Sequence, residues 1–373
     1  MSGEGAQTRS KRYSSLKTRF FISDLVLSVI ALGAFQLLLA RPVSNLAFDI
    51  HPNFYFACFI YITVFLAFMY AVSFPLNIAN SFFLERAFNL SRQGFKTWLW
   101  DEVKSVALSF GLSMFCIQLF YLLIRRFPQI WWLIAALGWI LFTIVLARFL
   151  PVLLIPLFYK YSPIKDEALR KRIMDLAGRS GIQLMDVCQI DFSRKTSKAN
   201  AALVGLGKTR KVILADTLMQ EFLPEEIEAV VAHEFGHCKY RHIWQLLMFS
   251  AIMTVAGFFV LSLLAGEIVV FTGATGLSDL YIFPILVFSM TAFGIIILPV
   301  QNLFSRILER QSDRFALEMT EDSGTFISMM KKLASTNLAE MEPSTLKKIF
   351  MYDHPPVGER IRMAEGYKIR DEG

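Results

Sequence analysis

Six long apolar runs, separated by polar segments, are the dominant pattern along the chain. A run of about 20 residues is long enough for an α-helix to cross the hydrocarbon core of a bilayer. The runs occupy residues 20–40, 54–83, 106–124, 130–158, 246–272 and 280–303. The pattern therefore predicts a mostly α-helical, polytopic membrane protein with about six transmembrane helices.

The main soluble segment lies between the fourth and fifth runs and mixes helix and strand patterns. Residues 168–181 have the spacing of an amphipathic helix, and residues 187–191 have the composition of a short strand. Residues 200–206 and 212–215 flank a polar turn that contains glycine, which predicts a β-hairpin. We expect an α+β domain here, and four parts in the whole chain: a membrane region at 1–158, this domain at 159–243, two membrane helices at 244–304 and a cytoplasmic segment at 305–373.

Basic residues at the ends of the apolar runs predict the orientation of the chain. The tail before residue 20 carries five of them, whereas the loop at 266–279 carries none. Because lysine and arginine are enriched in cytoplasmic loops, we expect both termini and the soluble domain on the cytoplasmic side, in the plasma membrane of a prokaryote or the endoplasmic reticulum of a eukaryote. The start resembles a signal peptide but lacks a clear cleavage site, so we expect an uncleaved first span.

The composition supports this class and excludes others. Hydrophobic residues make up 55% of the chain and the mean hydropathy is +0.48, which is too apolar for a soluble protein. The net charge of +7 could suit nucleic acid, but no basic and aromatic binding module is present, so we expect the lipid bilayer and no nucleic acid as a partner. The four cysteines form no C-x-x-C pair, and we interpret them as reduced packing residues.

Several charged residues lie within or beside the apolar runs, where a charge is costly unless it faces protein or water. They are Asp24, Asp101, Glu102, Lys104, Arg148 and Glu267. A position at a helix end, with the charge reaching the interface, explains most of them. Their sequence positions leave a functional role open.

The segment His233–His237, His-Glu-Phe-Gly-His, carries the clearest chemical signal. Residues four apart lie on one face of a helix, so His233 and His237 can bind a single metal ion, and zinc suits such a pair. Glu234 can then act as the general base that takes a proton from the attacking water. Pro224 followed by two glutamates is typical of a helix start, which places the motif on a helix. We expect one Zn²⁺ per chain and hydrolytic chemistry.

Two histidines leave a catalytic zinc site incomplete, because such sites usually have three protein ligands. Of the other histidines, His51 is expected on the opposite side of the membrane, and His242 lies off the helix face of the motif. Glu309 is the best candidate, with Asp313 one turn later as an acceptor for the second N–H of a ligating histidine. From the residues alone, this pair could equally be a solvated, charged helix face.

Further segments, from about residue 77 to the C-terminus, resemble the CAAX prenyl protease family of integral-membrane zinc metalloproteases (type I, H-E-x-x-H). In chain order they are residues 83–89 with 100–104, 158–163, 193–201, 212–218, the zinc helix, Glu309 with Asp313, and Asp-His-Pro-Pro-Val-Gly-Glu-Arg at 353–360. The resemblance implies that Glu309 is the third zinc ligand and Asp313 its supporting acid. It also implies that Asn200 binds the substrate backbone, and that His354, supported by Arg360, stabilises the oxyanion.

The resemblance also implies a fold and an activity. The fold is a set of membrane helices enclosing a wet chamber, with a gluzincin-like zinc protease domain at its cytoplasmic end. The activity is removal of the C-terminal -aaX tripeptide from a prenylated C-a-a-X protein or peptide, and we expect a monomer. Two features depart from the family pattern. We expect six membrane helices where many relatives have a further N-terminal one, which suits a prokaryotic member, and Lys198 and Ala199 replace a histidine and a serine.

Two other functions stay open on the sequence. A membrane protein quality-control protease would cleave peptides without a prenyl requirement. A transporter or channel with an incidental metal site would bind the metal and hydrolyse nothing.

Overall fold

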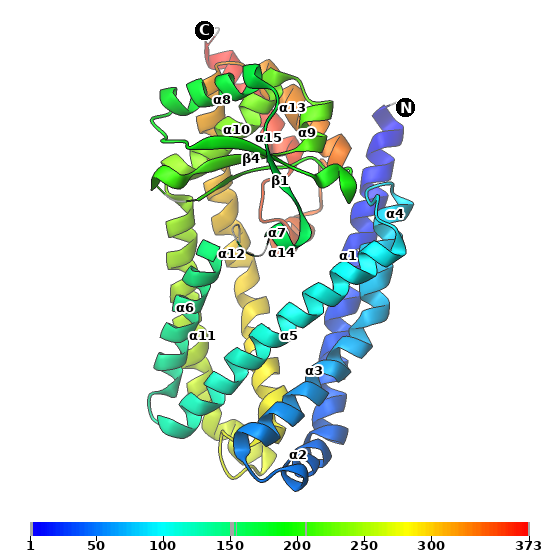
Figure 1. Cartoon of the computed structure of the whole chain (residues 1–373), viewed down its shortest axis with the longest axis vertical. Helices are drawn as coiled ribbons and strands as arrows, with labels where there is room; N and C mark the ends of the chain where they lie inside the picture. Colours follow the sequence, from blue (N-terminus) through cyan, green and yellow to red (C-terminus); the bar gives the residue numbers. More distant parts are fainter. Residues whose placement is uncertain (1–2, 150–152, 154, 206, 372–373) are drawn as a thin grey trace.

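The computed structural model describes residues 3–149, 153, 155–205 and 207–371. Within them, six helical segments are long and apolar enough to cross a membrane, as the apolar runs predict. They are Gln7–Ile50, Phe54–Ala87, Phe95–Arg126, Trp131–Phe149, His242–Thr272 and Leu280–Thr320. Figure 1 shows these segments below a smaller domain that carries the strands, with both chain termini at the upper end.

Five of the six membrane segments are longer than the apolar runs, because their helices continue into polar sequence. The first consists of α1 (Gly3–Ala34), a π-helical turn (Phe35–Leu39) and α2 (Ala40–Ile50), and the second of α3 (Phe54–Ile78), a π-helical turn (Ala79–Leu84) and α4 (Glu85–Ala87). The others are α5 (Phe95–Arg126), α6 (Trp131–Phe149), α11 (His242–Thr272) and α12 (Phe283–Thr320), the last preceded by a 3₁₀ turn at Leu280–Ile282. The run predicted at 130–158 is interrupted: α6 ends at Phe149, residues 150–152 and 154 lie outside the described part, and α7 (Ile155–Phe158) follows.

The membrane helices pack together mainly at the end away from the small domain. Phe35, Tyr61 and Tyr121 are fully buried there, in one cluster that joins α1, α3 and α5. A second cluster around Trp131 and Leu261 joins α6 to α11. Only 11–28% of the most apolar window of each span is buried inside the protein, so most of these side chains face lipid or internal space rather than a packed core.

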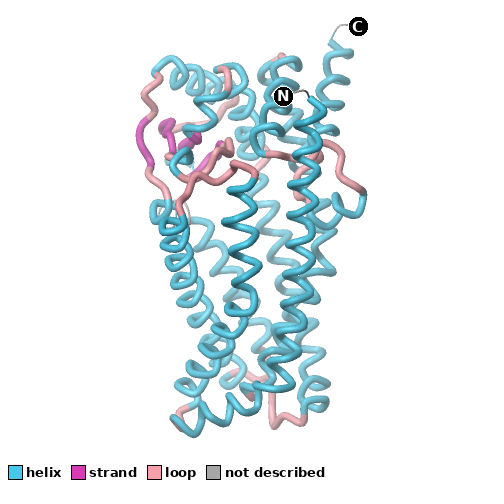
Figure 2. The backbone as a smooth tube through the Cα atoms, turned by 90° about the vertical axis from the view of Figure 1, so that its right-hand side faces the viewer, coloured by secondary structure: helices cyan, strands magenta, loops and turns pink. Residues whose placement is uncertain are grey.

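The small domain contains a four-stranded sheet at the end of the molecule where the termini lie (Figure 2). Its strands, in spatial order, are β1 (Tyr161–Pro163), β2 (Asp186–Ile190), β4 (Lys211–Ala215) and β3 (Ala201–Val204). β3 and β4 form the predicted antiparallel hairpin, whereas β2 and β4 are parallel. β1 was not predicted, because three residues ending in a proline give no alternating pattern. β3 lies at the edge of the sheet, with only β4 beside it among the described strands.

Helices cover the sheet and close a single hydrophobic core. They are α8 (Glu167–Arg179), α9 (Asp216–Glu221), α10 (Pro224–Lys239), α13 (Ser323–Asn337) and α15 (Val357–Asp371). α14 (Thr345–Met351) packs against α12 outside this core. Val187 and Leu214 from the sheet, Phe235 from α10 and Phe326 from α13 are fully buried in this core. α12 enters the same core through Phe315, so one continuous helix joins the membrane region to the small domain.

Candidate metalloprotease active site

The site forms where α10 crosses α12. Gly236 makes the close approach possible: a Cβ at this position would lie 2.8 Å from Ser312 Cα, well inside a normal carbon–carbon contact. α10 carries the His-Glu-Phe-Gly-His motif as predicted, and it is buried on the side that faces α12. Glu309, one turn before Ser312 on α12, is thereby brought to the two histidines.

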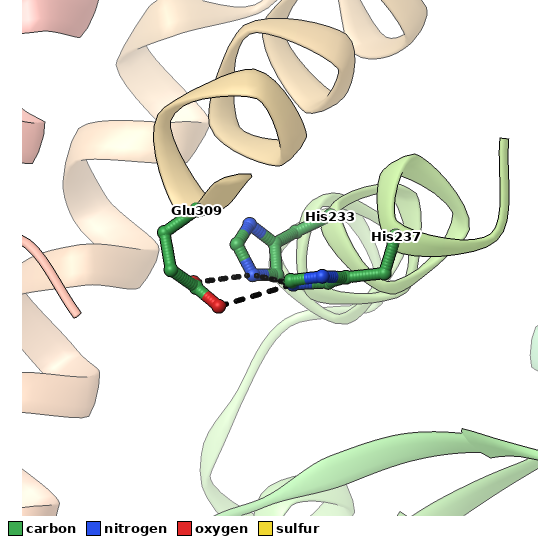
Figure 3. A group of neighbouring side chains, drawn as sticks. All are labelled: His233, His237 and Glu309. Atoms are coloured by element: carbon green, nitrogen blue, oxygen red, sulfur yellow. Dashed lines mark hydrogen bonds and ion pairs between the residues drawn. The ribbon is translucent and has the colours of Figure 1, made fainter. Parts of the chain in front are cut away.

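His233, His237 and Glu309 point their side chains at one another (Figure 3). The two Nε2 atoms are 3.2 Å apart. Glu309 Oε2 is 3.3 Å from His233 Nε2, and Glu309 Oε1 is 3.3 Å from His237 Nε2. One potential ligand atom from each residue lies within 4.8 Å of the other two, so a single metal ion can contact all three.

Hydrogen bonds on the far side of each ring orient the two histidines. His233 Nδ1 is 2.8 Å from Asp313 Oδ1, and a carboxylate can only accept there. His242 Nε2 donates to Gln311 Oε1 at 3.0 Å, which leaves His242 Nδ1 as the acceptor for His237 Nδ1, also at 3.0 Å. Both Nε2 atoms therefore carry lone pairs directed at the shared point, the arrangement that a metal ion requires.

The donor set fits a metal ion. Two imidazole lone pairs that converge at 3.2 Å repel each other unless a cation lies between them. Glu309 Oε2 is buried and has no hydrogen-bond partner among the described residues, although a buried carboxylate oxygen requires one. Burial would lower the pKa of His233, but the carboxylates of Asp313 and Glu309 raise it to about 9. The surroundings thus favour positive charge at this point.

Arg360 lies behind the metal-binding residues. Its Nε donates to Asp313 Oδ2 at 2.8 Å, its Nη2 donates to Asp313 Oδ1, and Nη2 lies 3.4 Å from His233 Nδ1. Arg360 therefore pairs with Asp313, and among the described residues no hydrogen bond joins it to His354. It lies on the first turn of α15, which packs against α12, whereas His354 lies in the loop before that helix.

A cavity of about 380 Å³ opens beside the metal-binding residues. Asn200, Glu234, His354 and Arg360 all line it, so the structure gathers the residues that sequence reasoning placed in the active site. Burial raises the pKa of Glu234, although the backbone N–H of Leu203 donates to its carboxylate. A base with a raised pKa is better matched to proton transfer near neutral pH.

His354 is held at the edge of this cavity by its neighbour Asp353. Its Nδ1 is 2.9 Å from Asp353 Oδ1, and its Nε2 is 3.3 Å from Glu309 Oε1. The hydrogen bond to Asp353 raises the pKa of His354. When the ring is protonated, its Nε2 is a donor.

Three supporting residues were missed by sequence reasoning. His242 was set aside because it is off the face of the motif, yet it lies directly behind His237. Asn337 accepts from Ala199 N at 2.9 Å and donates to Ala199 O at 3.1 Å, which fixes the segment before Asn200. Lys198 reaches Glu85 at 2.9 Å. No spacing rule links Ala199 to Asn337 or Lys198 to Glu85, which are more than 100 residues apart in the chain, so neither contact could be read from the sequence.

A polytopic membrane protein in which a His-Glu-x-x-His helix meets a carboxylate from a second helix is a membrane metalloprotease. Residues 163–368 match Peptidase family M48, and residues 4–160 match the CAAX prenyl protease N-terminal region, described as having five membrane helices. The first match covers more than half of the chain, and the chain belongs to Peptidase family M48. The second region holds four of the candidate spans found among the described residues.

Individual relatives agree with this assignment. The metalloprotease YhfN of Bacillus subtilis, itself uncharacterized, is 32% identical over 282 residues, which cover 74% of this chain and 66% of that protein. CAAX prenyl protease 1 of Saccharomyces cerevisiae is 28% identical over 319 residues, covering 78% and 68%. The crystal structure of S. mikatae Ste24p superposes with a TM-score of 0.83 at 25% identity, covering 96% of this chain and 88% of that one. The resemblance and the fold class are thereby confirmed, and the transporter or channel alternative is not favoured.

Proposed function

We propose that this protein is a zinc metalloendopeptidase in which His233, His237 and Glu309 hold the metal. The observation that carries the proposal is the convergence of these three donors beside a cavity that also contains Glu234 and His354. Two imidazoles and one carboxylate are a donor set of catalytic zinc sites. Asp313 and His242 orient the two imidazoles, and Arg360 balances the buried charge of Asp313.

The reaction follows from the positions of these side chains. When bound, zinc polarises the scissile carbonyl and makes water a stronger acid. Glu234 takes the proton of the attacking water and later delivers it to the leaving amine. His354, protonated and held by Asp353, donates from Nε2 to the oxygen that becomes negative in the transition state.

The edge strand β3 is suited to hold the peptide. Its outer edge is unpaired among the described strands, and the N–H of Leu203 points to the Glu234 carboxylate. A substrate that pairs with β3 as an extra strand would lie along the catalytic cavity, fixed by main-chain hydrogen bonds. Asn200, exposed at the start of β3 and lining the cavity, would bind the substrate backbone at one end.

For the substrate we propose the C-terminal -aaX tripeptide of a prenylated C-a-a-X protein or peptide. A relative with this name and a similar sequence supports the proposal. So does a second cavity of about 410 Å³, lined mainly by apolar side chains such as Leu108, Ile155 and Phe192, which adjoins the catalytic cavity at Asn200 and Ala201. An apolar group next to the scissile bond would bury its surface there. A quality-control protease without a prenyl requirement is the alternative.

The location follows from topology and charge. We propose an integral membrane monomer with both termini, the small domain and the active site on the cytoplasmic side, since six spans return the chain to its starting side. The chain would divide after residues 158, 243 and 304 into an N-terminal membrane region, the soluble protease domain, two further membrane helices and a C-terminal cytoplasmic segment. The membrane helices, little buried by one another, would enclose the wet chamber.

A paired peptide assay tests the activity and the substrate together. A farnesylated C-a-a-X peptide and its unmodified twin are incubated with purified protein, with and without a chelator. Cleavage of the farnesylated peptide alone, abolished by the chelator, is the expected result. Equal rates for the twins would refute lipid-directed specificity and leave the quality-control protease. Hydrolysis that survives complete removal of metal would refute the metalloprotease mechanism.

A further inference from the structure

A cavity of about 670 Å³ lies at the joint between the membrane helices and the small domain. Its walls come from the loop before α5, the first turns of α5, the segment around α7 and the loop after β2. Six cationic side chains and a single carboxylate, Asp101, line it; the cations are Arg92, Lys96, Lys104, Lys160, Arg194 and Lys195. None of its described lining residues belongs to the catalytic cavity. It is a separate and strongly basic site.

Three of these six cations have no counter-charge among the described residues. Asp101 is shared by Lys104, at 2.7 Å, and Lys195, and Arg194 pairs with Asp191 at 2.9 Å. In the part of the chain that the structure describes, no carboxylate lies within ion-pair distance of Arg92, Lys96 or Lys160, and all three are exposed. A concave surface that gathers uncompensated cations favours an anion.

We expect this cavity at the depth of the lipid headgroups. α5 has 32 residues, about 48 Å at 1.5 Å per residue, whereas the hydrocarbon core is about 30 Å thick. Because the apolar run of this helix begins only at residue 106, its first turns extend beyond the hydrocarbon core on the side of the small domain. Trp100 lines the cavity and is 64% exposed, and exposed tryptophan is typical of the membrane interface.

We propose that this basic cavity binds the phosphate of an anionic phospholipid from the leaflet next to the small domain. Lysine and arginine clusters at this depth bind anionic headgroups, and the neighbouring aromatic side chain would pack on the glycerol and the upper acyl chain. An acidic peptide would satisfy the same charges but would leave Trp100 without a partner. Lys195 lies in the segment that leads to β3, so the bound lipid would link α5 to the strand beside the active site.

Native mass spectrometry of the full-length protein in detergent tests the proposal without reference to its activity. The protein is titrated with dioleoylphosphatidylglycerol or with zwitterionic dioleoylphosphatidylcholine. We expect one phosphatidylglycerol to be retained with clear preference. Removing both free lysines, Lys96→Gln with Lys160→Gln, should weaken its binding about 25-fold, at about fivefold for each lost cation. Lys96→Arg with Lys160→Arg should retain it.

The matched control is Lys171→Gln with Lys331→Gln, which removes the same charge from exposed positions on α8 and α13. It should bind the lipid like the wild type, and thermal unfolding should show that all variants are folded. Equal retention of phosphatidylglycerol by both glutamine double variants, or equal retention of phosphatidylcholine, would overturn the proposal. Displacement of the lipid by millimolar glycerol 3-phosphate would show that the cavity is a site for free phosphate. Displacement by a glutamate-rich peptide would show that it is a site for an acidic segment. Either result would also overturn the proposal of a phospholipid site.

Discussion

Substitution of Gly236 by alanine tests the helix contact that assembles the metal site. The new Cβ would lie 2.8 Å from Ser312 Cα and 3.1 Å from Ser312 Cβ. Carbon atoms in contact are about 3.5–4.0 Å apart, so α10 and α12 must separate by roughly 0.7 Å. Metal–ligand distances tolerate only about 0.2 Å. Because the shift moves Glu309 away from the histidines, zinc affinity should fall on the order of 10–100-fold.

The stability of the same variant reports the balance of two opposing effects. Alanine is favoured over glycine in a helix by about 1 kcal/mol, whereas overpacking costs about 1–3 kcal/mol, so the net change should be a loss of up to about 2 kcal/mol. Zinc affinity is measured by competition with a chromogenic chelator, and stability by thermal unfolding of the zinc-free protein. Gly178→Ala on α8, where nothing lies within 4 Å of the added Cβ, is the control and should not lose stability. Wild-type zinc affinity together with increased stability in Gly236→Ala would refute the reasoning.

Three further predictions concern the groups around the site. Asp313→Asn should lower zinc affinity about 10–100-fold, because the ring of His233 loses its carboxylate acceptor; unchanged affinity in the chelator competition would contradict this role. His242→Phe, which keeps an aromatic ring but removes both ring nitrogens, should lower zinc affinity in the same way through His237. A variant that binds zinc like the wild type would show that His242 only fills space. Burial raises the pKa of Glu226, but hydrogen bonds from Lys332 and then Ser328 hold that pKa below its usual range. These hydrogen bonds to the ionised carboxylate stabilise the fold by about 2 kcal/mol. The stabilisation is therefore present above the unfolded pKa of about 4.3 and is lost as the pH falls through the folded pKa. Unfolding of Glu226→Gln across pH 3–7 should show a lower plateau and a weaker pH dependence than the wild type, and parallel curves would count against the assignment.

The apolar runs predicted the six membrane segments because a helix needs about 20 consecutive apolar residues to cross the hydrocarbon core of a bilayer. The ends of these segments were not predicted. α12 continues from Phe283 to Thr320 as one helix, although its apolar run ends at residue 303, because contacts with the small domain stabilise its polar half. Hydropathy alone contains no information about such contacts.

The candidate site shows a similar division. His233, Glu234 and His237 could be placed because four-residue spacing on a helix is a local property. Glu309 could be assigned only by resemblance, because its partners are more than 70 residues away and meet it through the packing at Gly236. His242 was set aside because, on one continuous ideal helix, it would lie off the face that carries His233 and His237. α10 ends at Lys239, however, and Arg241 has a left-handed backbone with φ of 57°, so the chain turns before α11 begins.

The central claim is that Glu234 acts as the base beside a zinc ion held by His233, His237 and Glu309. The most direct test measures bound zinc and peptide hydrolysis in parallel for the wild type and for Glu234→Gln. The account predicts one zinc per chain in both proteins, with hydrolysis reduced about 10²–10⁴-fold in the variant. A variant that binds zinc and cleaves peptide at the wild-type rate would contradict it.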